Sequence, residues 1–212
     1  MNLILLGAPG AGKGTQAELL IKALGIPSIS TGNMLREAMA NGTEVGLKAK
    51  YYMENGLLVP DDVIMGIVAE RVARPDCRKG FILDGMPRTL AQAEALEAAG
   101  VRIDHVVSIE IDDSVIEGRM TGRRVCSKCG ASYHIVANPT KIEGKCDLCG
   151  ADTTTRKDDA PETVRKRLVE YHAKTEVLKD FYAKRGNLRE VEGNQPIKAI
   201  TAEIIEKIGA QV

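Results

Sequence analysis

Short apolar runs recur along the chain, and each is followed by a segment in which apolar residues return every three or four positions. The first run, LILLG, occupies Leu3–Gly7 and leads into KGTQAELLIKAL. Each pair predicts a strand followed by an amphipathic helix, so the alternation indicates βαβ units and a parallel sheet covered on both faces. We expect five strands, at Leu3–Gly7, Pro27–Ser30, Phe81–Gly85, His105–Ile111 and Leu188–Gly193.

Two stretches interrupt this alternation. Residues 31–59 have a helical pattern only, and residues 122–159 carry four of the five cysteines and few aliphatic side chains. We interpret both as insertions in one core domain. The expected division is a core of residues 1–29, 60–121 and 160–212, a helical insertion of residues 30–59, and a cysteine-bearing insertion of residues 122–159.

Composition narrows the class of protein. A chain of 212 residues with 44% hydrophobic residues can bury a sizeable core. Lys and Arg number 29 and so do Asp and Glu, so no basic field is present to hold nucleic acid. The opening MNLILLGAPG is too short to span a membrane and lacks the features of a secretion signal. We therefore expect a cytoplasmic protein whose cysteines are metal ligands or free thiols.

The stretch GAPGAGKGT between the first strand and helix nearly matches the phosphate-binding pattern G-x-x-x-x-G-K-[ST]. Gly7, Gly12 and Lys13 fit, but Gly14 follows the lysine and the hydroxyl comes at Thr15. Backbone N–H groups of such a turn converge on an anion at the positive end of the helix, and the lysine adds a charge for the β- and γ-phosphates. The alternative is a glycine-rich turn with a solvated lysine, which the number and placement of the small residues disfavour.

Further cationic residues follow. DGMPRT places Asp84 at a strand end, where ligands of open α/β sheets bind, and Arg88 comes four residues later. The alternative for these two is a surface ion pair. Guanidinium groups bind phosphate oxygens in a bidentate manner. Four arginines flank the cysteine-bearing insertion, although singly each would be a solvated surface residue in most proteins: Arg119, Arg123, Arg156 and Arg167.

The cysteines form two C-x₂-C pairs, CSKC and CDLC, separated by sixteen residues. Cys126, Cys129, Cys146 and Cys149 thus have the spacing of a structural zinc site, in which four thiolates close the coordination shell. Two disulfides or an iron site are the alternatives. Cys77 stands apart and is expected to be an ordinary thiol.

Six segments together resemble one family, in its order and at its spacing: GAPGAGKGT, ISTGNMLREA, LLVPDDV, FILDGMPRTLAQAEAL, TGRRVC and TTRKDDAPETVRKRLVEYH. The family is the adenylate kinases, a branch of the nucleoside monophosphate kinases in which glycine and then threonine usually follow the lysine. The resemblance runs nearly end to end. It implies a P-loop NTPase-like three-layer α/β fold with a five-stranded parallel sheet, a helical AMP-binding insertion and a zinc-ribbon-like lid.

The resemblance also implies the reaction, which is reversible transfer of the terminal phosphoryl group of MgATP to AMP, giving two ADP and serving adenine nucleotide homeostasis. Such a transfer needs alignment and positive charge rather than a general base. The implied cofactors are Mg²⁺ and a structural Zn²⁺. The implied partners are ATP, AMP and ADP, with no nucleic acid and no membrane, and the protein is expected to be a monomer.

Site residues carry over from the family by position. The catalytic set would be Lys13, Asp84, Arg88, Arg123, Arg156 and Arg167. ATP would contact Gly10, Ala11, Gly12, Lys13, Gly14, Thr15, Arg119, Arg123, Ser132, Tyr133 and Gln195, the last through its backbone carbonyl. AMP would contact Thr31, Arg36, Leu57, Leu58, Val59, Gly85, Met86, Pro87, Arg88, Gln92, Arg156 and Arg167. Asp84 would help to hold magnesium through water, and Asp158 and Asp159 would orient the arginines.

Two positions depart from the family pattern, since Asn33 stands where aspartate is more usual and Met86 where phenylalanine is common. Neither removes a phosphate donor, so we expect altered packing or altered hinge behaviour rather than lost activity. Taken without the resemblance, Gln92 would be a solvated helix residue.

Two other functions are considered. A kinase for UMP, CMP or GMP would share the loop and the arginines, and by resemblance Thr31, Gln92 and the metal-bearing lid favour AMP. A zinc-ribbon module fused to an ATPase fold would bind nucleic acid, but the balanced charge and the 3% aromatic content disfavour it.

Overall fold

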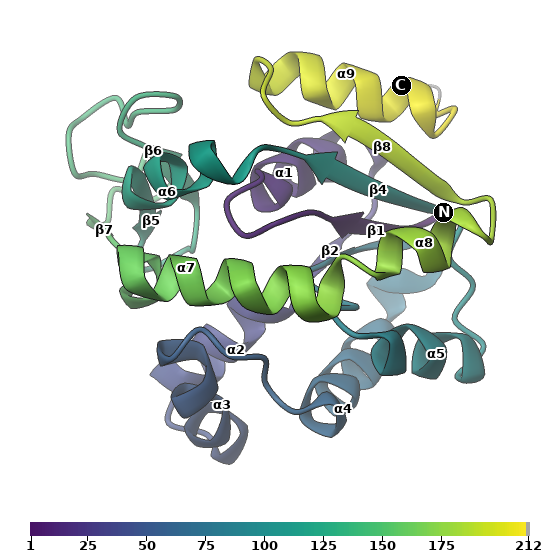
Figure 1. The fold of residues 1–212 in the computed structure, drawn as a ribbon. Coiled ribbons are helices and arrows are strands. Elements are labelled where there is room, and N and C mark those ends of the chain that lie inside the picture. Colours follow the sequence, from purple (N-terminus) through teal and green to yellow (C-terminus); the bar gives the residue numbers. More distant parts are fainter. Residues whose placement is uncertain (211–212) are drawn as a thin grey trace.

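The computed structural model describes residues 1–210 and shows a parallel sheet between two layers of helices (Figure 1). The sheet has five strands in the order β2-β3-β1-β4-β8. The predicted five-stranded sheet is therefore confirmed, and each strand begins and ends within one residue of its expected range. The strands are β1 (Asn2–Leu6), β2 (Ser28–Ser30), β3 (Phe81–Asp84), β4 (His105–Glu110) and β8 (Leu188–Glu192).

Both faces of the sheet are buried, which explains why the first strand is continuously apolar from Leu3 to Leu6 instead of alternating. Leu3 and Leu5 belong to a cluster shared with α1 (Lys13–Leu24) and α9 (Ile197–Lys207). Ile4 and Leu6 belong to the cluster on the opposite face, which is shared with α4, α5 and α8. These helices span α4 (Asp61–Val72), α5 (Leu90–Ala98) and α8 (Leu178–Ala183).

A buried glutamine links the first helix to the last. The Gln16 side chain is 2% exposed; its Nε2 donates to the Ile197 carbonyl at 3.0 Å, and its Oε1 accepts from the Thr201 hydroxyl at 2.7 Å. Both ends of this amide are thus satisfied within the core, as a buried polar group requires. The contact fixes α1, which follows the glycine-rich loop, against α9.

The first insertion is helical, as expected, and consists of α2 (Thr31–Ala40) and α3 (Glu44–Glu54). The Thr43 hydroxyl caps α3 by accepting from the Gly46 N–H at 3.1 Å. A side chain at Gly46 would overlap the backbone of Ala38, so the close packing of the two helices depends on this glycine.

The second insertion lies between α6 (Asp113–Thr121) and α7 (Pro161–Glu170). It holds a small antiparallel sheet in the order β6-β5-β7, built from β5 (Arg123–Cys126), β6 (Ser132–His134) and β7 (Thr153–Thr154). Its buried cluster contains two cysteines beside Ala131 and Tyr133. With so few apolar residues, this insertion has little hydrophobic core of its own, and it extends away from the main sheet (Figure 1).

The remaining helical pieces are short. Two 3₁₀ turns occupy Pro75–Lys79 and Lys157–Asp159, and a π turn at Tyr171–Thr175 continues α7 toward α8. Among residues 1–210, no helix combines the length and the apolar character needed to cross a bilayer.

Candidate active site and metal centre

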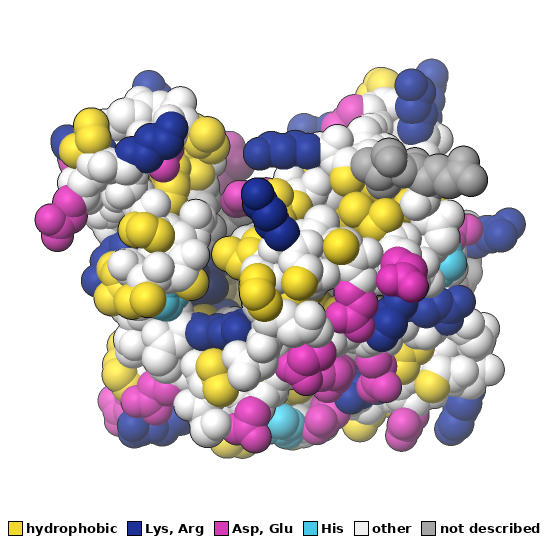
Figure 2. Space-filling view, turned by 90° about the horizontal axis from the view of Figure 1, so that it is seen from above, with side chains coloured by type: hydrophobic (Ala, Val, Ile, Leu, Met, Phe, Trp, Pro, Cys, Tyr) yellow, Lys and Arg dark blue, Asp and Glu magenta, His cyan; other side chains and the backbone are white. Residues whose placement is uncertain are grey.

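A cavity of about 830 Å³ lies where the strands β1 and β3 end, bounded by both insertions. Figure 2 shows the surface hollowed between the cysteine-bearing insertion and the rest of the molecule. Among its described lining residues, cationic side chains outnumber acidic ones. The cationic residues are Lys13, Arg36, Arg88, Arg119, Arg123, Arg156, Arg167 and Lys198, and the acidic ones are Glu18, Asp84, Asp158 and Glu170.

The glycine-rich loop forms one wall of the cavity and runs from β1 into α1. Gly7, Gly10 and Gly12 have φ angles of +133°, +82° and +105°, which other residues rarely adopt. A Cβ at Gly7 would also come within 2.6 Å of the Ile109 carbonyl oxygen. Because the first N–H groups of a helix have no partner within it, the start of α1 at Lys13 is suited to bind an anion.

Lys13 is held by the loop that precedes it. Its Nζ donates to the Gly7 carbonyl at 2.6 Å and to the Ala8 carbonyl at 2.8 Å. Burial lowers the pKa of Lys13 to about 7, and Arg88 lowers it further, whereas Asp84 acts in the opposite direction. An anion bound beside Nζ would favour the charged form of Lys13 and raise its pKa again.

The turn after β3 forms the opposite wall. The Thr31 hydroxyl donates to the Gly85 carbonyl at 2.9 Å, and Arg88 Nε donates to the same oxygen at 2.8 Å. Arg88 thus bonds the backbone instead of forming a surface ion pair with Asp84. Burial and then Arg167 lower the pKa of Arg88 to about 10, so the guanidinium remains charged at neutral pH.

Two aspartates hold two of the arginines. Arg123 donates through two nitrogens to the Asp159 carboxylate, with Nε at 2.8 Å from Oδ2. Arg167 donates to Asp158 Oδ2 at 2.9 Å. Asp159 is 5% exposed, and a buried carboxylate needs such partners. These pairs fix the directions of the two guanidinium groups.

The charges of two further arginines are not balanced by a hydrogen-bonded carboxylate. Arg36 donates to the neutral Asn33 side chain at 2.6 Å, and burial is the main cause of its lowered pKa. Burial and then Arg36 and Arg123 lower the pKa of Arg156 to about 9. Arg156 Nε is buried and has no hydrogen-bond partner among the described residues. An anion between these side chains would relieve their repulsion.

In the cysteine-bearing insertion, all three residues of strand β6 border the cavity. Tyr133 also borders the cavity, but its hydroxyl is directed toward the cysteines, since it accepts from the Asp147 N–H at 2.9 Å and lies 3.3 Å from Cys146 Sγ. His134, which sequence reasoning missed, lines the cavity; its Nδ1 accepts from the Val136 N–H at 3.1 Å and its Nε2 is buried without a described partner. The two-residue period of a strand is the signal that would have found it, given Ser132.

Two more predicted site residues, Arg119 and Gln195, make contacts with or near the segment that follows β8. Arg119 donates to the Gly193 carbonyl at 2.9 Å, and burial lowers the pKa of Arg119. The Gln195 side chain donates to Glu203 Oε2 at 3.1 Å, so it is directed toward α9. The predicted contact of the Gln195 backbone carbonyl with a base stays a prediction.

Gln92 is buried, at 2% exposure, so the interpretation of this residue as a solvated helix position is wrong. Met86 is fully buried in the cluster that contains Leu83 and is not part of the cavity wall, where it was predicted. The other predicted nucleotide-site residues do line the cavity: residues 10–15, 31, 36, 57–59, 84, 85, 87, 88, 92, 119, 123, 132, 133, 156, 167 and 195.

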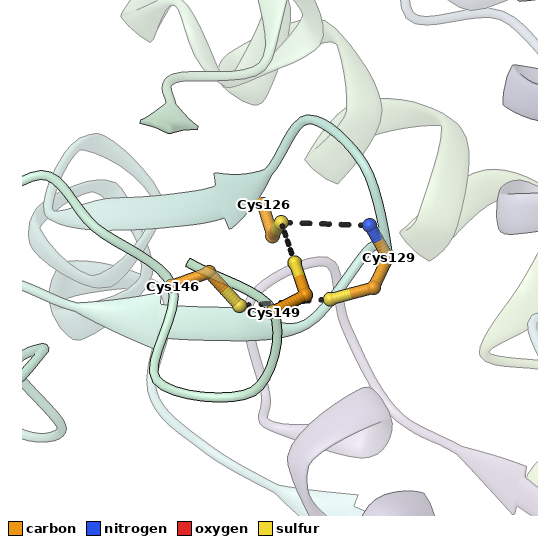
Figure 3. A group of neighbouring side chains, drawn as sticks. All are labelled: Cys126, Cys129, Cys146 and Cys149. Carbon is orange, nitrogen blue, oxygen red and sulfur yellow. Dashed lines mark hydrogen bonds between the residues drawn. The ribbon is translucent and has the colours of Figure 1, made fainter. Parts of the chain in front are cut away.

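The four cysteines of the two C-x₂-C pairs lie together at one end of the insertion (Figure 3). The four Sγ atoms all lie within 4.8 Å of one another. Cys126 Sγ is 3.4 Å from Cys149 Sγ, and Cys129 Sγ is 3.6 Å from Cys146 Sγ. Disulfide sulfurs lie about 2.05 Å apart, so the disulfide alternative is wrong and all four are free thiols. Zn–S bonds of about 2.3 Å in a tetrahedron would separate the sulfurs by about 3.8 Å, so these residues fit zinc.

Comparison with known proteins gives a consistent picture. The adenylate kinase family model matches residues 5–187. An adenylate kinase of Caldicellulosiruptor bescii is 52% identical over 215 residues, covering all of both chains. An adenylate kinase of Agathobacter rectalis is 50% identical over 213 residues, covering 99% of this chain and all of the relative. An adenylate kinase of Shouchella clausii is 54% identical over 208 residues, covering 96% of each.

Proposed function

The chain belongs to the adenylate kinase family of phosphotransferases, and we propose that it moves the terminal phosphoryl group of MgATP to AMP by in-line displacement. The observation that carries this proposal is the convergence of six arginines and Lys13 on one cavity beside a glycine-rich loop. Two polyanions must meet there, and the transferring group spreads charge over its equatorial oxygens. Fixed cations in an enclosed site stabilise that charge.

Each wall of the cavity has its own part in the reaction. The loop and Lys13 hold the ATP phosphates, while Arg36 and Arg88 hold the AMP phosphate. Arg123 and Arg167, oriented by their aspartates, contact the group in transfer. We propose that residues 30–59 and 122–159 are the movable parts that bind AMP and cover the reaction, since enclosure excludes the water that would otherwise accept the phosphoryl group.

Two metals belong to this proposal. Magnesium, which offsets phosphate charge when bound, fits beside Asp84 and Thr15, which offer oxygen atoms at the start of α1. A Cβ at Gly14 would lie 3.8 Å from Asp84 Oδ2, which places the carboxylate at that helix start. Zinc on the four cysteines would be structural, because four thiolates leave no open position. A monomeric state and a place in the cytoplasm stay predictions.

Two arginines on α7 provide the test. Arg167 lines the cavity, while Arg165, two residues earlier, is 66% exposed and pairs with Glu117. We expect Arg167→Lys to lower kcat/KM for AMP by roughly 10²–10³. The reason is that a lysine cannot bind two phosphate oxygens at once, as a guanidinium group can. Arg165→Lys should leave kcat/KM within about twofold of the unsubstituted protein.

Both variants are assayed with MgATP and AMP, GMP, CMP or UMP, and the products are quantified by chromatography. Selective ADP formation from AMP supports the proposal. A preference for another monophosphate would overturn the acceptor assignment, and equal losses in the two variants would overturn the assignment of Arg167.

A further inference from the structure

The side-chain amide of Gln92 is held from two sides in a way that fixes its orientation. Gln92 Oε1 accepts from the Arg88 backbone N–H at 2.7 Å, and Nε2 donates to Asp61 Oδ1 at 2.6 Å. A backbone N–H can only donate and an ionised carboxylate can only accept. The oxygen therefore faces Arg88 and the nitrogen faces Asp61, and the reverse orientation would break both bonds.

Asp61 is itself held in place. It lies in the first turn of α4, where the helix dipole favours a negative charge. Its Oδ2 accepts from the Thr89 hydroxyl at 3.0 Å, and that hydroxyl accepts in turn from the Gln92 backbone N–H at 3.1 Å. Asp61 does not line the cavity, whereas Gln92 does. Any effect of Asp61 on a ligand is therefore exerted through Gln92.

The hydrogen-bonding groups that the Gln92 amide leaves free face part of the cavity that is suited to a flat base. Leu35, Val59 and Ile64 line the same cavity and belong to one buried cluster, so they offer apolar surface for the faces of a ring. After its two fixed bonds, the Gln92 amide keeps one free N–H donor and one free lone pair on oxygen. This donor and acceptor can pair with a purine edge that offers one acceptor and one donor in the matching order.

The orientation of this pair determines which purine is accepted. A 6-aminopurine donates from its amino group and accepts at N1, whereas a 6-oxopurine accepts at O6 and donates from N1. For a base in a fixed position, the amide must be reversed to pair with the second type. A site with a fixed donor and acceptor rejects the wrong pattern strongly, because buried groups would be left unpaired.

We propose that Asp61 is a positioning residue that locks the Gln92 amide and so makes the acceptor site selective for 6-aminopurine monophosphates over 6-oxopurine monophosphates. The inference rests on the proposed function, since it concerns the acceptor site of that reaction. It deepens that function by assigning part of its specificity to a carboxylate that touches no substrate.

The test compares AMP with IMP, which carries a 6-oxo group and no other added substituent. We expect Asp61→Ala to lower the ratio of kcat/KM for AMP to that for IMP by roughly 10- to 100-fold, as for loss of a hydrogen bond to a charged group. Asp61→Asn keeps a neutral acceptor, so its ratio should fall between those of Asp61→Ala and the unsubstituted protein. The change should appear mainly in KM for AMP, with kcat little altered.

Asp62→Ala is the matched control. Asp62 is exposed in the same turn of α4 and has the same relation to the helix dipole, but it does not contact Gln92. Its AMP-to-IMP ratio should not change, even if the melting temperature falls. Thermal denaturation of every variant identifies those that are folded at the assay temperature.

The outcomes separate the two levels of the proposal. If the unsubstituted protein phosphorylates neither AMP nor IMP, the proposed function itself fails. If it phosphorylates both equally, the phosphoryl transfer to AMP stands and the inferred selectivity is overturned. If it is selective for AMP, and a folded Asp61 variant keeps the full ratio, Asp61 is merely structural and the inference is overturned.

Discussion

Binding of ATP should take up a proton, because Lys13 has its lowest pKa when the phosphates are absent. In the structure, burial holds the pKa of Lys13 at about 7, against an ordinary 10.5. A neutral amine has two N–H groups, and the carbonyls of Gly7 and Ala8 receive two hydrogen bonds from Nζ. The neutral form is thus well satisfied, and phosphates placed beside it would raise the pKa again.

The expected number of protons taken up per ATP follows from this shift in the pKa of Lys13. With a pKa of about 7, Lys13 is about one-tenth protonated at pH 8, so restoring its charge takes up about 0.9 proton per ATP. Because the pKa of Lys13 rises on binding, the affinity for ATP decreases with increasing pH. It is greatest below the pKa of Lys13 in the free protein and falls above it, by about 50-fold between pH 7 and pH 9.

Isothermal titration calorimetry with MgATP in two buffers of different ionisation enthalpy measures this uptake. At pH 8 the terminal phosphate of ATP is already ionised, since its second pKa is about 6. Arg88, with a pKa of about 10, stays charged, and Arg156, with a pKa of about 9, contributes only about a tenth of a proton. Lys13 is therefore the main source of the signal.

Lys13→Gln is the control, because glutamine has no titrating group. The variant should bind more weakly and without proton uptake at pH 8. No uptake by the unsubstituted protein would refute the reasoning, and so would equal uptake by the variant, since the proton would then belong to another group.

Three further predictions concern metal affinity, packing and pH. Tyr133→Phe should weaken zinc binding roughly tenfold in chelator competition, because the phenol contacts Cys146 Sγ at 3.3 Å; unchanged affinity would exclude this role. Gly46→Ala should destabilise the protein by about 1–3 kcal/mol in urea unfolding, because the added methyl overlaps the Ala38 backbone; an unchanged midpoint would contradict the α2–α3 packing. His172 bonds two carboxylates, first of all Glu176, which raise its pKa, so it stabilises the fold below pH 6.5 and less as pH rises through the raised value. Urea midpoints of His172→Gln should therefore differ from those of the unsubstituted protein at pH 5.5 and converge at pH 8.5.

Local pattern was sufficient to predict the sheet and the loop. The run LILLG identifies a strand buried on both faces, and GAPGAGKGT places a glycine-rich turn before a helix. Spacing alone also predicted the cysteine cluster. These features depend on residues close together in the chain, for which periodicity and spacing carry the information.

The residues that form the site were harder to predict from the sequence, because the site depends on contacts between distant segments. Each arginine taken alone would be interpreted as a surface residue, and only the resemblance to a family assigned them to one site. Tyr133 was assigned to the nucleotide by resemblance and does border the cavity, but the contact of its hydroxyl with Cys146 Sγ was not predicted. Asp61 was missed entirely, since it lies 31 residues from Gln92 and acts from behind the cavity wall. Met86 was assigned to the AMP site by resemblance to the family, whereas its apolar side chain is buried in the core.

The buried amide of Gln16 has a consequence for the order in which the chain folds during synthesis. Its two partners, at Ile197 and Thr201, are 181 and 185 residues away in the sequence. During synthesis on the ribosome, the helix that follows the glycine-rich loop is made well before α9, which lies more than 170 residues later in the chain. Until then, a polar group destined for the core has no partner, an arrangement that costs about 1–3 kcal/mol when buried. The amide of Gln16, and with it the helix that follows the loop, can therefore reach its final packing only once α9 has been made.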